Sequence, residues 1–355
     1  MKIKSLFTLF AAAIFAAGCG TLPRQGKHEP RQGDEIVAAG QFFHTGTRVV
    51  LWLDPGGYDA YRVERRFTPF EKSDWQSTQA EVKGMNSPNR YGLRKNTLST
   101  NEIERVRGGG WDLALLRRVV DQFVLHFDVA GTSRTCFKTL QDTRDLSVHF
   151  MLDLDGTIYQ TLDLKERAWH ATTSNDRSVG VEIANIGAYP VKGNNPFAEW
   201  YRTNATGQVC ITVPDRFGAG GGIRTPGFIG HPARNEPVYG NIQGEDLVQY
   251  DFTPEQYAAL TKLTASLCRV FPKIKCRYPV DAEGKLIPRK LANDALKNYQ
   301  GVMGHYHIQT DKVDPGPALD WDKVIGGARA ILGIEPPKPA PAGPLLSPRQ
   351  RDLLR

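Results

Sequence analysis

The chain has 355 residues, of which 40% are hydrophobic and 23% charged, and its formal net charge is +7. This hydrophobic content is ordinary for a globular protein and excludes a chain that is disordered throughout. An integral membrane bundle is excluded because the sequence holds one long apolar run, at its N-terminus. Basic residues are scattered, so nothing indicates nucleic acid, whereas the mild positive charge suits an anionic partner.

Residues 1–19 have the layout of an export signal. Two lysines precede an apolar run from Leu6 to Ala17, too short to span a bilayer stably, and small residues then lead to Cys19. This arrangement resembles the lipobox of bacterial lipoproteins, which implies lipidation of Cys19 and a protein anchored in the cell envelope. The resemblance implies that it faces the periplasm, from the outer rather than the inner membrane, and touches the membrane through this anchor only. The alternative is an ordinary secretory signal with a chance cysteine, and both alternatives imply export.

The rest of the chain divides into four segments by composition. Residues 20–34 predict a polar tether, and residues 35–114 predict an N-terminal extension with a strand near Arg48–Leu53 but no legible function. Residues 115–334 predict the main domain, and residues 335–355 predict a proline-rich, disordered tail.

Four segments of the main domain have the apolar character or alternation of strands: 122–129, 148–154, 157–160 and 178–186. Asp155-Gly156 predicts a hairpin turn between the second and third. In the last segment Glu182 lies between Gly180 and Ala184 on one face, which leaves room for a ligand.

Two amphipathic helices follow an insertion. Residues 188–250 are rich in glycine and proline and predict a loop-rich lid or groove wall. Within them, the glycine run at 218–222 lacks the lysine and helix of a phosphate-binding loop, so we interpret it as flexible. One helix is predicted from Thr253, which caps Pro254 at the first helical position, and another from Asp320. Strands interspersed with helices predict one α/β domain.

Four cysteines remain besides Cys19, and export makes disulfides compatible with this even count. Cys268 and Cys276 are close enough to close a short loop, and Cys136–Cys210 is the second expected pair. The absence of a CxxC sequence argues against a cysteine zinc cluster.

Five histidines fall in or beside predicted strands and turns: His126, His149, His170, His305 and His307. A single histidine in a strand is more often a core residue than a ligand, but several of them with nearby carboxylates favour zinc. In GHYHIQTDKVDPGP, Lys312 and Asp314 are two residues apart and point to the same side of an extended segment. A surface turn with a Lys–Asp pair explains this segment equally well.

Five blocks resemble, in order, the zinc-dependent N-acetylmuramoyl-L-alanine amidases, the family related to peptidoglycan recognition proteins: FVLHFD, SVHFMLDLDGTIYQ, RAWHA, SVGVEIAN and GHYHIQTDKVDPGPALDW. They cover residues 121–326 apart from the insertion. The resemblance implies a mixed central β-sheet flanked by helices, one Zn²⁺ per chain and peptidoglycan or muropeptides as partner. It implies hydrolysis of the amide between N-acetylmuramic acid and L-alanine, in cell-wall turnover or remodelling.

The resemblance also implies roles for individual residues. The three zinc ligands match His126, His305 and Asp314, which leaves a fourth position for water. The implied general base is Glu182, and the cation that stabilises the oxyanion is Lys312. The substrate-binding positions are His170 and His149.

The chain departs from the family pattern at three positions. Phe127 replaces a second histidine after the first ligand, and Val148 replaces a catalytic tyrosine found in some relatives. His307 forms a His-x-His with His305, and the chemistry of the two rings does not decide between them, although the family spacing favours His305. Two other functions stay open: a non-catalytic peptidoglycan-binding module, and a zinc peptidase that cuts within the stem peptide.

Overall fold

The computed structural model describes residues 25–335, so the expected signal, Cys19 and the tail from residue 336 lie outside the described residues. Residues 25–32 belong to a unit of their own, in which Lys27 and Glu29 form an ion pair of 3.0 Å. The described residues from Gly33 onward form the second unit. Among the described helices, none has both the length and the apolar character that crossing a bilayer requires.

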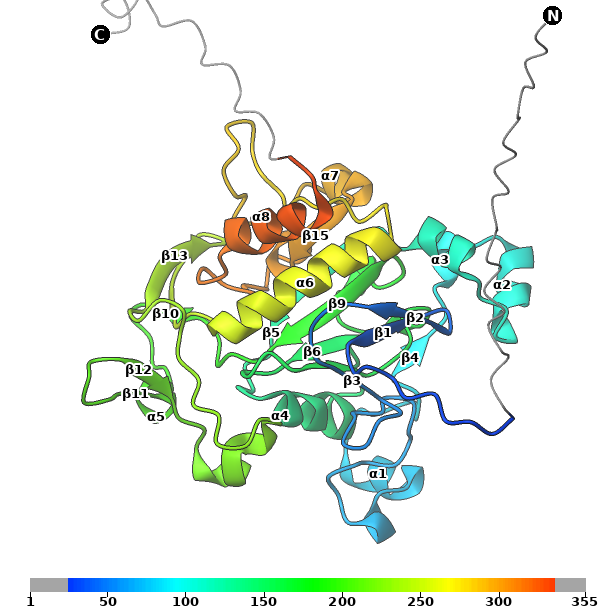
Figure 1. The fold of residues 1–355 in the computed structure, drawn as a ribbon, viewed down its shortest axis with the longest axis horizontal. Helices are drawn as coiled ribbons and strands as arrows, with labels where there is room; N and C mark the ends of the chain where they lie inside the picture. Colours follow the sequence, from blue (N-terminus) through cyan, green and yellow to red (C-terminus); the bar gives the residue numbers. More distant parts are fainter. Residues whose placement is uncertain (1–24, 336–355) are drawn as a thin grey trace, which may run out of the picture. The chain divides into compact units, whose positions relative to one another are not determined.

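A six-stranded mixed sheet forms the centre of the second unit (Figure 1). In spatial order its strands are β15 (Gly301–Gly304), β5 (Gln122–Phe127), β9 (Ser178–Ile183), β6 (Phe150–Leu152), β7 (Ile158–Gln160) and β3 (Val49–Leu51). Neighbouring strands are parallel except β6 and β7, which form the antiparallel hairpin predicted at Asp155-Gly156. Gly156 has a φ of +78°, a conformation that glycine adopts without strain. The predicted mixed sheet is therefore confirmed.

Helices cover both faces of this sheet. The two predicted helices are α6 (Pro254–Val270) and α8 (Trp321–Leu332), which pack against each other (Figure 1). Thr253 caps α6 together with Gln256, and the apolar side of the helix enters the same core as Phe123 and Leu125 of β5. Because strand side chains alternate, His126 points to the opposite face, where α4 (Ser133–Lys138) packs near β6 and β9.

The N-terminal segment, predicted as an extension, contributes a strand and a buried side chain to this domain. Its strand β3 completes the central sheet, and Arg94 is fully buried. The Arg94 guanidinium donates hydrogen bonds of 2.9–3.2 Å to the carbonyls of Leu164, Asn175, Asp176 and Ser178. The expected boundary at residue 114 is therefore not a division in the structure. The remaining elements of this segment are β1 (Glu35–Ala38), β2 (Gln41–His44), α1 (Trp75–Glu81), β4 (Tyr91–Gly92), which pairs with β8 (Arg167–Ala168), α2 (Thr100–Arg107) and α3 (Leu113–Val119).

The insertion is more regular than its composition predicts. It contains a three-stranded sheet of β10 (Tyr189–Pro190), β14 (Glu245–Gln249) and β13 (Val238–Ile242), the hairpin β11 (Tyr201–Thr203) with β12 (Val209–Ile211), and α5 (Phe197–Trp200). Trp200 fixes it to the domain, because the ring lies where a Cβ at Gly131 would come within 2.3 Å. Beyond the insertion, α7 (Asn293–Asn298) precedes β15.

The four cysteines of the described residues are free thiols, which corrects both expected disulfides. Cys136 is buried in a hydrophobic cluster beside the central sheet, whereas Cys210 lies half-exposed in β12, and both thiols are free. Cys268 and Cys276 do meet, and a hydrogen bond between their thiols raises the pKa of Cys268 and lowers that of Cys276. Their sulfurs are thus neighbours without a covalent bond.

Candidate active site

A cavity of about 360 Å³ lies where three parallel strands end. It brings together six residues singled out in the sequence: His126, His170, Glu182, His305, Lys312 and Asp314. His126 of β5 stands directly opposite Glu182 of β9, and Gly304 of β15 stands opposite Leu125, so His305 follows at the same edge. The register of the sheet therefore places these groups, because parallel strands present their carboxyl ends at one edge.

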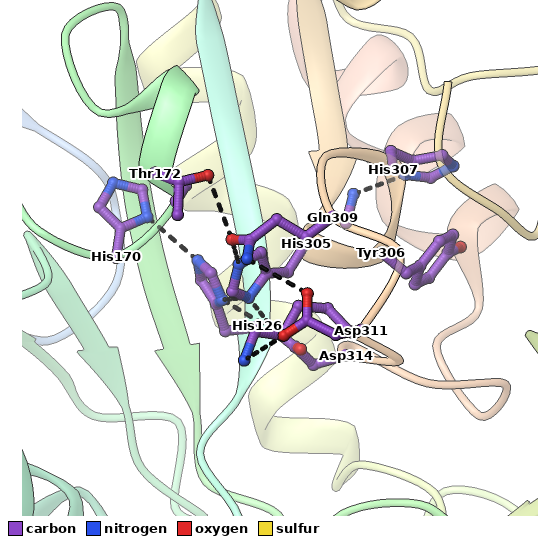
Figure 2. Close-up of polar contacts among 12 residues, drawn as sticks. His126, His170, Thr172, His305, Tyr306, His307, Gln309, Asp311 and Asp314 are labelled. Carbon is purple, nitrogen blue, oxygen red and sulfur yellow. Dashed lines mark hydrogen bonds and ion pairs between the residues drawn. The ribbon is translucent and has the colours of Figure 1, made fainter. Parts of the chain in front are cut away.

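His126, His305 and Asp314 form a compact triangle of ligand atoms (Figure 2). The His126 Nδ1 atom lies 2.8 Å from Asp314 Oδ2 and 3.1 Å from His305 Nδ1, and the third side, His305 Nδ1 to Asp314 Oδ2, is 3.1 Å. Ligand atoms about 2.0–2.1 Å from a tetrahedral zinc ion stand roughly 3.3–3.4 Å apart. The triangle therefore has nearly the size of one face of a zinc coordination tetrahedron.

Hydrogen-bond partners lie on the far side of both imidazoles. The His305 Nε2–H group donates to Gln309 Oε1 at 2.7 Å, which leaves the lone pair of this ring on Nδ1, facing the Asp314 carboxylate. His126 Nε2 lies 3.1 Å from His170 Nδ1, and either ring can supply the proton of this hydrogen bond. In the tautomer in which His126 supplies it, three electron-pair donors converge on one point, an arrangement that suits zinc with its outer hydrogen-bond partners.

A close backbone contact brings Asp314 beside His305. Gly304 precedes the histidine, and a Cβ at this position would come within 2.6 Å of Pro315 Cδ. Glycine thus lets the segment after Asp314 lie directly on the end of β15. The Tyr306 N–H group also donates to the Asp314 carbonyl at 3.1 Å, which ties the two ligand segments together.

The site shifts the pKa values of Asp314 and Glu182 in opposite directions. Burial alone raises the pKa of Asp314, but His305 and His126 outweigh it and hold this pKa below its ordinary value. Burial raises the pKa of Glu182, and the negative charges of Asp314 and Asp128 raise it further. Asp314 is therefore suited to remain an anionic ligand and Glu182 to exchange a proton.

His170 fills the space that the sequence analysis reserved for a ligand above Gly180. A Cβ at Gly180 would lie 2.5 Å from the His170 ring, so glycine makes room for this imidazole. His170 Nδ1 shares a hydrogen bond with His126 Nε2, and His170 Nε2 shares one of 3.3 Å with Ser178 Oγ. The structure thus places His170 in the cavity wall and, in addition, behind a proposed metal ligand.

Two of the five histidines lie outside the cavity. His307 points away from it (Figure 2), with Nδ1 accepting from the Gly304 N–H group and Nε2–H donating to the Ile287 carbonyl. His149 is fully buried, accepts from the Gly180 N–H group and lies 3.0 Å from the Glu166 carbonyl oxygen. The expected substrate contact of His149 is corrected accordingly, because its ring is enclosed and occupied by backbone groups.

The cavity also contains residues that the sequence analysis missed. Gln309 orients His305, and Arg144 adds a second cation to the cavity lining besides Lys312. Asp128 accepts hydrogen bonds from three backbone N–H groups through Oδ1, and burial raises its pKa to about 8. Asp128, two residues after His126 at a strand end, was detectable as a polar residue at the same sheet edge, whereas Gln309 and Arg144 lie in irregular segments without such a signal.

The family model described as N-acetylmuramoyl-L-alanine amidase matches residues 116–317. The chain belongs to this family. It is accordingly an amidase, a hydrolase that acts in peptidoglycan processing. The matched segment carries all six residues that the cavity brings together.

Several solved structures are similar at low sequence identity. A selenomethionine derivative of AmpD is 16% identical, with 67% of this chain and 89% of that chain covered and a TM-score of 0.31. AmiD from E. coli, in complex with anhydro-N-acetylmuramic acid-L-Ala-D-gamma-Glu-L-Lys, is 18% identical over 61% of this chain and 58% of that chain, with a TM-score of 0.32. LysC from Clostridium intestinale is 13% identical over 62% and 89%, with a TM-score of 0.29. No curated protein matches the chain.

Proposed function

We propose that this amidase is zinc-dependent and cleaves the amide between N-acetylmuramic acid and L-alanine with His126, His305 and Asp314 as its metal ligands. The observation that supports this most strongly is the triangle of ligand atoms, with sides of 2.8–3.1 Å, in which Gln309 holds the His305 lone pair on Nδ1. Two histidines and one carboxylate are a donor set of catalytic zinc sites, which keep a fourth position open. When bound, zinc supplies a Lewis acid that polarises the amide carbonyl and makes water more acidic.

Glu182 is the group placed to move the proton. It stands opposite His126 on the neighbouring strand and faces the same cavity as the three ligands. Its raised pKa lets it accept a proton from the attacking water and return it to the leaving amine of L-alanine. The amide C–N bond breaks as this amine takes the proton, so the stem peptide leaves with a neutral amino group and the lactyl carbon keeps the water oxygen as a carboxylic acid.

Lys312 is the cation placed to stabilise negative charge on the amide oxygen. Its side chain is 35% exposed and lines the cavity two residues from Asp314. The ammonium group reaches Asp311 at 3.5 Å, an exposed partner that a developing oxyanion can replace. This arrangement supports electrostatic stabilisation of the tetrahedral intermediate by a group that is already in place.

The cellular setting is part of the same proposal. The signal-like segment that ends at Cys19 supports export and lipid anchoring, and a periplasmic amidase on the envelope would act on the wall or on shed muropeptides. Metabolic labelling with a fatty-acid analogue, compared between the full chain and a Cys19→Ala variant, tests the anchor. Label that persists in the variant contradicts it.

The test of the chemistry is Glu182→Gln, which removes the proton acceptor and keeps the shape. Glu283→Gln is the matched control, because Glu283 lies in an exposed turn and its carboxylate has no role in the cavity. We expect Glu182→Gln to keep the wild-type zinc content while turnover of a muropeptide falls roughly 10²–10⁴-fold.

The products decide between the remaining alternatives. An amidase releases stem peptides with a free L-alanine amino terminus and leaves the glycan intact. Cleavage inside the stem peptide would show a zinc peptidase, and binding without any cleavage would show a recognition module. Full activity of Glu182→Gln would contradict the role of this carboxylate.

A further inference from the structure

A second hollow lies beside the catalytic cavity, and three segments without an assigned role build it. We define the basic groove as two adjoining cavities of about 340 Å³ and 820 Å³, which share Arg66, Phe67 and Arg134. The N-terminal segment, α4 and the insertion together contribute its five cations: Arg66, Arg134, Lys138, Arg216 and Arg224. Five exposed cations from separate parts of the chain thus line these two adjoining cavities.

Within residues 25–335, four of these five cations form no ion pair: Arg66, Arg134, Arg224 and Lys138. The fifth, Arg216, pairs with Glu199. The Arg66 guanidinium donates to the Gly57 carbonyl, which positions it without neutralising its charge. The guanidinium carbons of Arg66 and Arg134 lie 5.5 and 5.1 Å from the same Phe67 centroid, so these two like charges repel one another over a distance comparable with the screening length of about 8 Å in physiological salt. An anionic ligand would relieve this repulsion.

Aromatic rings pack against the guanidinium groups of Arg66 and Arg134 and hold them in place. Arg134 lies over the Phe67 ring at 5.1 Å, and Arg66 lies between Phe67 and Tyr58 at 5.5 and 5.1 Å from their centroids. These distances allow cation–π attraction, which orients the planar groups. The groove is therefore a formed surface and not a chance collection of mobile side chains.

The basic groove explains why glycine occurs in the run at 218–222. Gly222 has a φ of +82°, and a Cβ at this position would come within 2.5 Å of Arg134 Cδ. On the other side, a Cβ at Gly56 would lie 3.0 Å from Arg224 Nη1. Glycine at these two positions lets the backbone of the insertion and of the N-terminal segment pass close to the arginines.

The basic groove and the catalytic cavity meet along α4 and the turn that follows it. Thr139 lines both, with Arg134 and Lys138 on the groove side and Cys136 and Leu140 on the cavity side. A long ligand can therefore occupy both hollows at once. A small ligand that fills the catalytic cavity would not reach the three unpaired arginines, because none of them lines that cavity.

We propose that the basic groove binds the carboxylates of stem peptides in polymeric peptidoglycan and holds the polymer while one stem enters the catalytic cavity. Guanidinium groups match carboxylates in planar, two-point hydrogen bonds, and several such contacts suit a polymer with repeated anionic stems. The hollow shape and the aromatic rings of Phe67 and Phe217 fit a polymer strand better than a flat lipid surface. This inference rests on the proposed function, since it takes peptidoglycan as the substrate.

The test compares a charge-removal triple variant with a matched control in the full chain. The test variant is Arg66→Gln, Arg134→Gln and Arg224→Gln together. The control is Arg202→Gln, Lys285→Gln and Arg289→Gln, which removes the same charge from exposed residues outside both hollows. Measurements are co-sedimentation with isolated peptidoglycan sacculi and the ratio of kcat/KM on sacculi to kcat/KM on a small soluble muropeptide.

We expect the test variant to bind sacculi about ten-fold more weakly and to lower that ratio by a similar factor, while the control matches wild type. Amidation of the sacculus carboxylates should weaken wild-type binding to the level of the test variant. Wild-type binding by the test variant, or wild-type binding to amidated sacculi, would overturn the proposal. The proposal would also be overturned if the test variant lost binding to anionic phospholipid vesicles while it bound sacculi as wild type does. If the wild type cleaves neither substrate, the proposed function fails, whereas co-sedimentation still reports on the groove.

Discussion

Replacing Gly304 by alanine tests whether one backbone contact sets the geometry of the metal ligands. The added Cβ would lie 2.6 Å from Pro315 Cδ and 3.1 Å from Tyr306 Cε1. Carbon atoms pack at about 3.5–4.0 Å, so Pro315 must move by roughly 1 Å. Asp314 precedes this proline and must move with it, whereas metal sites tolerate displacements of only about 0.2 Å.

We expect Gly304→Ala to lower the free energy of unfolding by about 1–3 kcal/mol, the usual cost of overpacking, and to weaken zinc binding at least ten-fold. Gly326→Ala is the matched control, because it adds the same methyl group in α8 with no atom within 4 Å. Competition with a chromogenic chelator measures the affinity, and denaturant titration measures the stability. Wild-type zinc affinity in Gly304→Ala would refute the claim that this contact positions Asp314.

Three further predictions concern individual side chains. Lys312→Met should keep zinc while kcat on a muropeptide falls roughly 100- to 1000-fold, and a near-normal kcat would remove Lys312 from the chemistry. Gln309→Leu deprives His305 Nε2–H of its acceptor, so zinc affinity measured by chelator competition should fall about 10- to 100-fold; unchanged affinity would contradict this orienting role. Burial lowers the pKa of His307 and of His149 to about 3, below the ordinary value near 6.5, so their neutral forms stabilise the fold above pH 6.5 and that stability is lost as the pH falls toward 3. Each histidine should lower the free energy of unfolding by roughly 1.5 kcal/mol between pH 6.5 and pH 5. Denaturant titrations should show a shallower decline in His307→Gln than in wild type; an equal decline would contradict the pKa shift, and a steeper one its sign.

The sequence indicated which polar residues come together in the cavity better than it indicated the architecture around them. His126 and Glu182 end apolar strands, and parallel strands bring their carboxyl ends together, so their meeting follows from the local pattern. His149 also sits in a strand-like segment, but whether its ring faces the cavity or the core depends on Arg94 and the 163–167 backbone. No local pattern contains that information.

The N-terminal segment shows a second limit of sequence patterns. Ser99 and Glu102 form the capping box of α2, a detectable signal that the sequence analysis did not use. Arg94 gave no signal at all, because its burial depends on carbonyl groups about 70 to 84 residues away along the chain. Whether this segment belongs to the domain depends on tertiary contacts, which local sequence patterns do not contain.

The most direct test of the central claim is zinc content and muropeptide cleavage of the full chain, measured beside an Asp314→Ala variant. The variant loses the carboxylate that lies within 3.1 Å of both histidine nitrogens. The account predicts one zinc ion per wild-type chain and peptides with a free L-alanine amino terminus, and the loss of both in the variant. A zinc-free wild type that still cleaves, or an Asp314→Ala variant that keeps both zinc and activity, would contradict it.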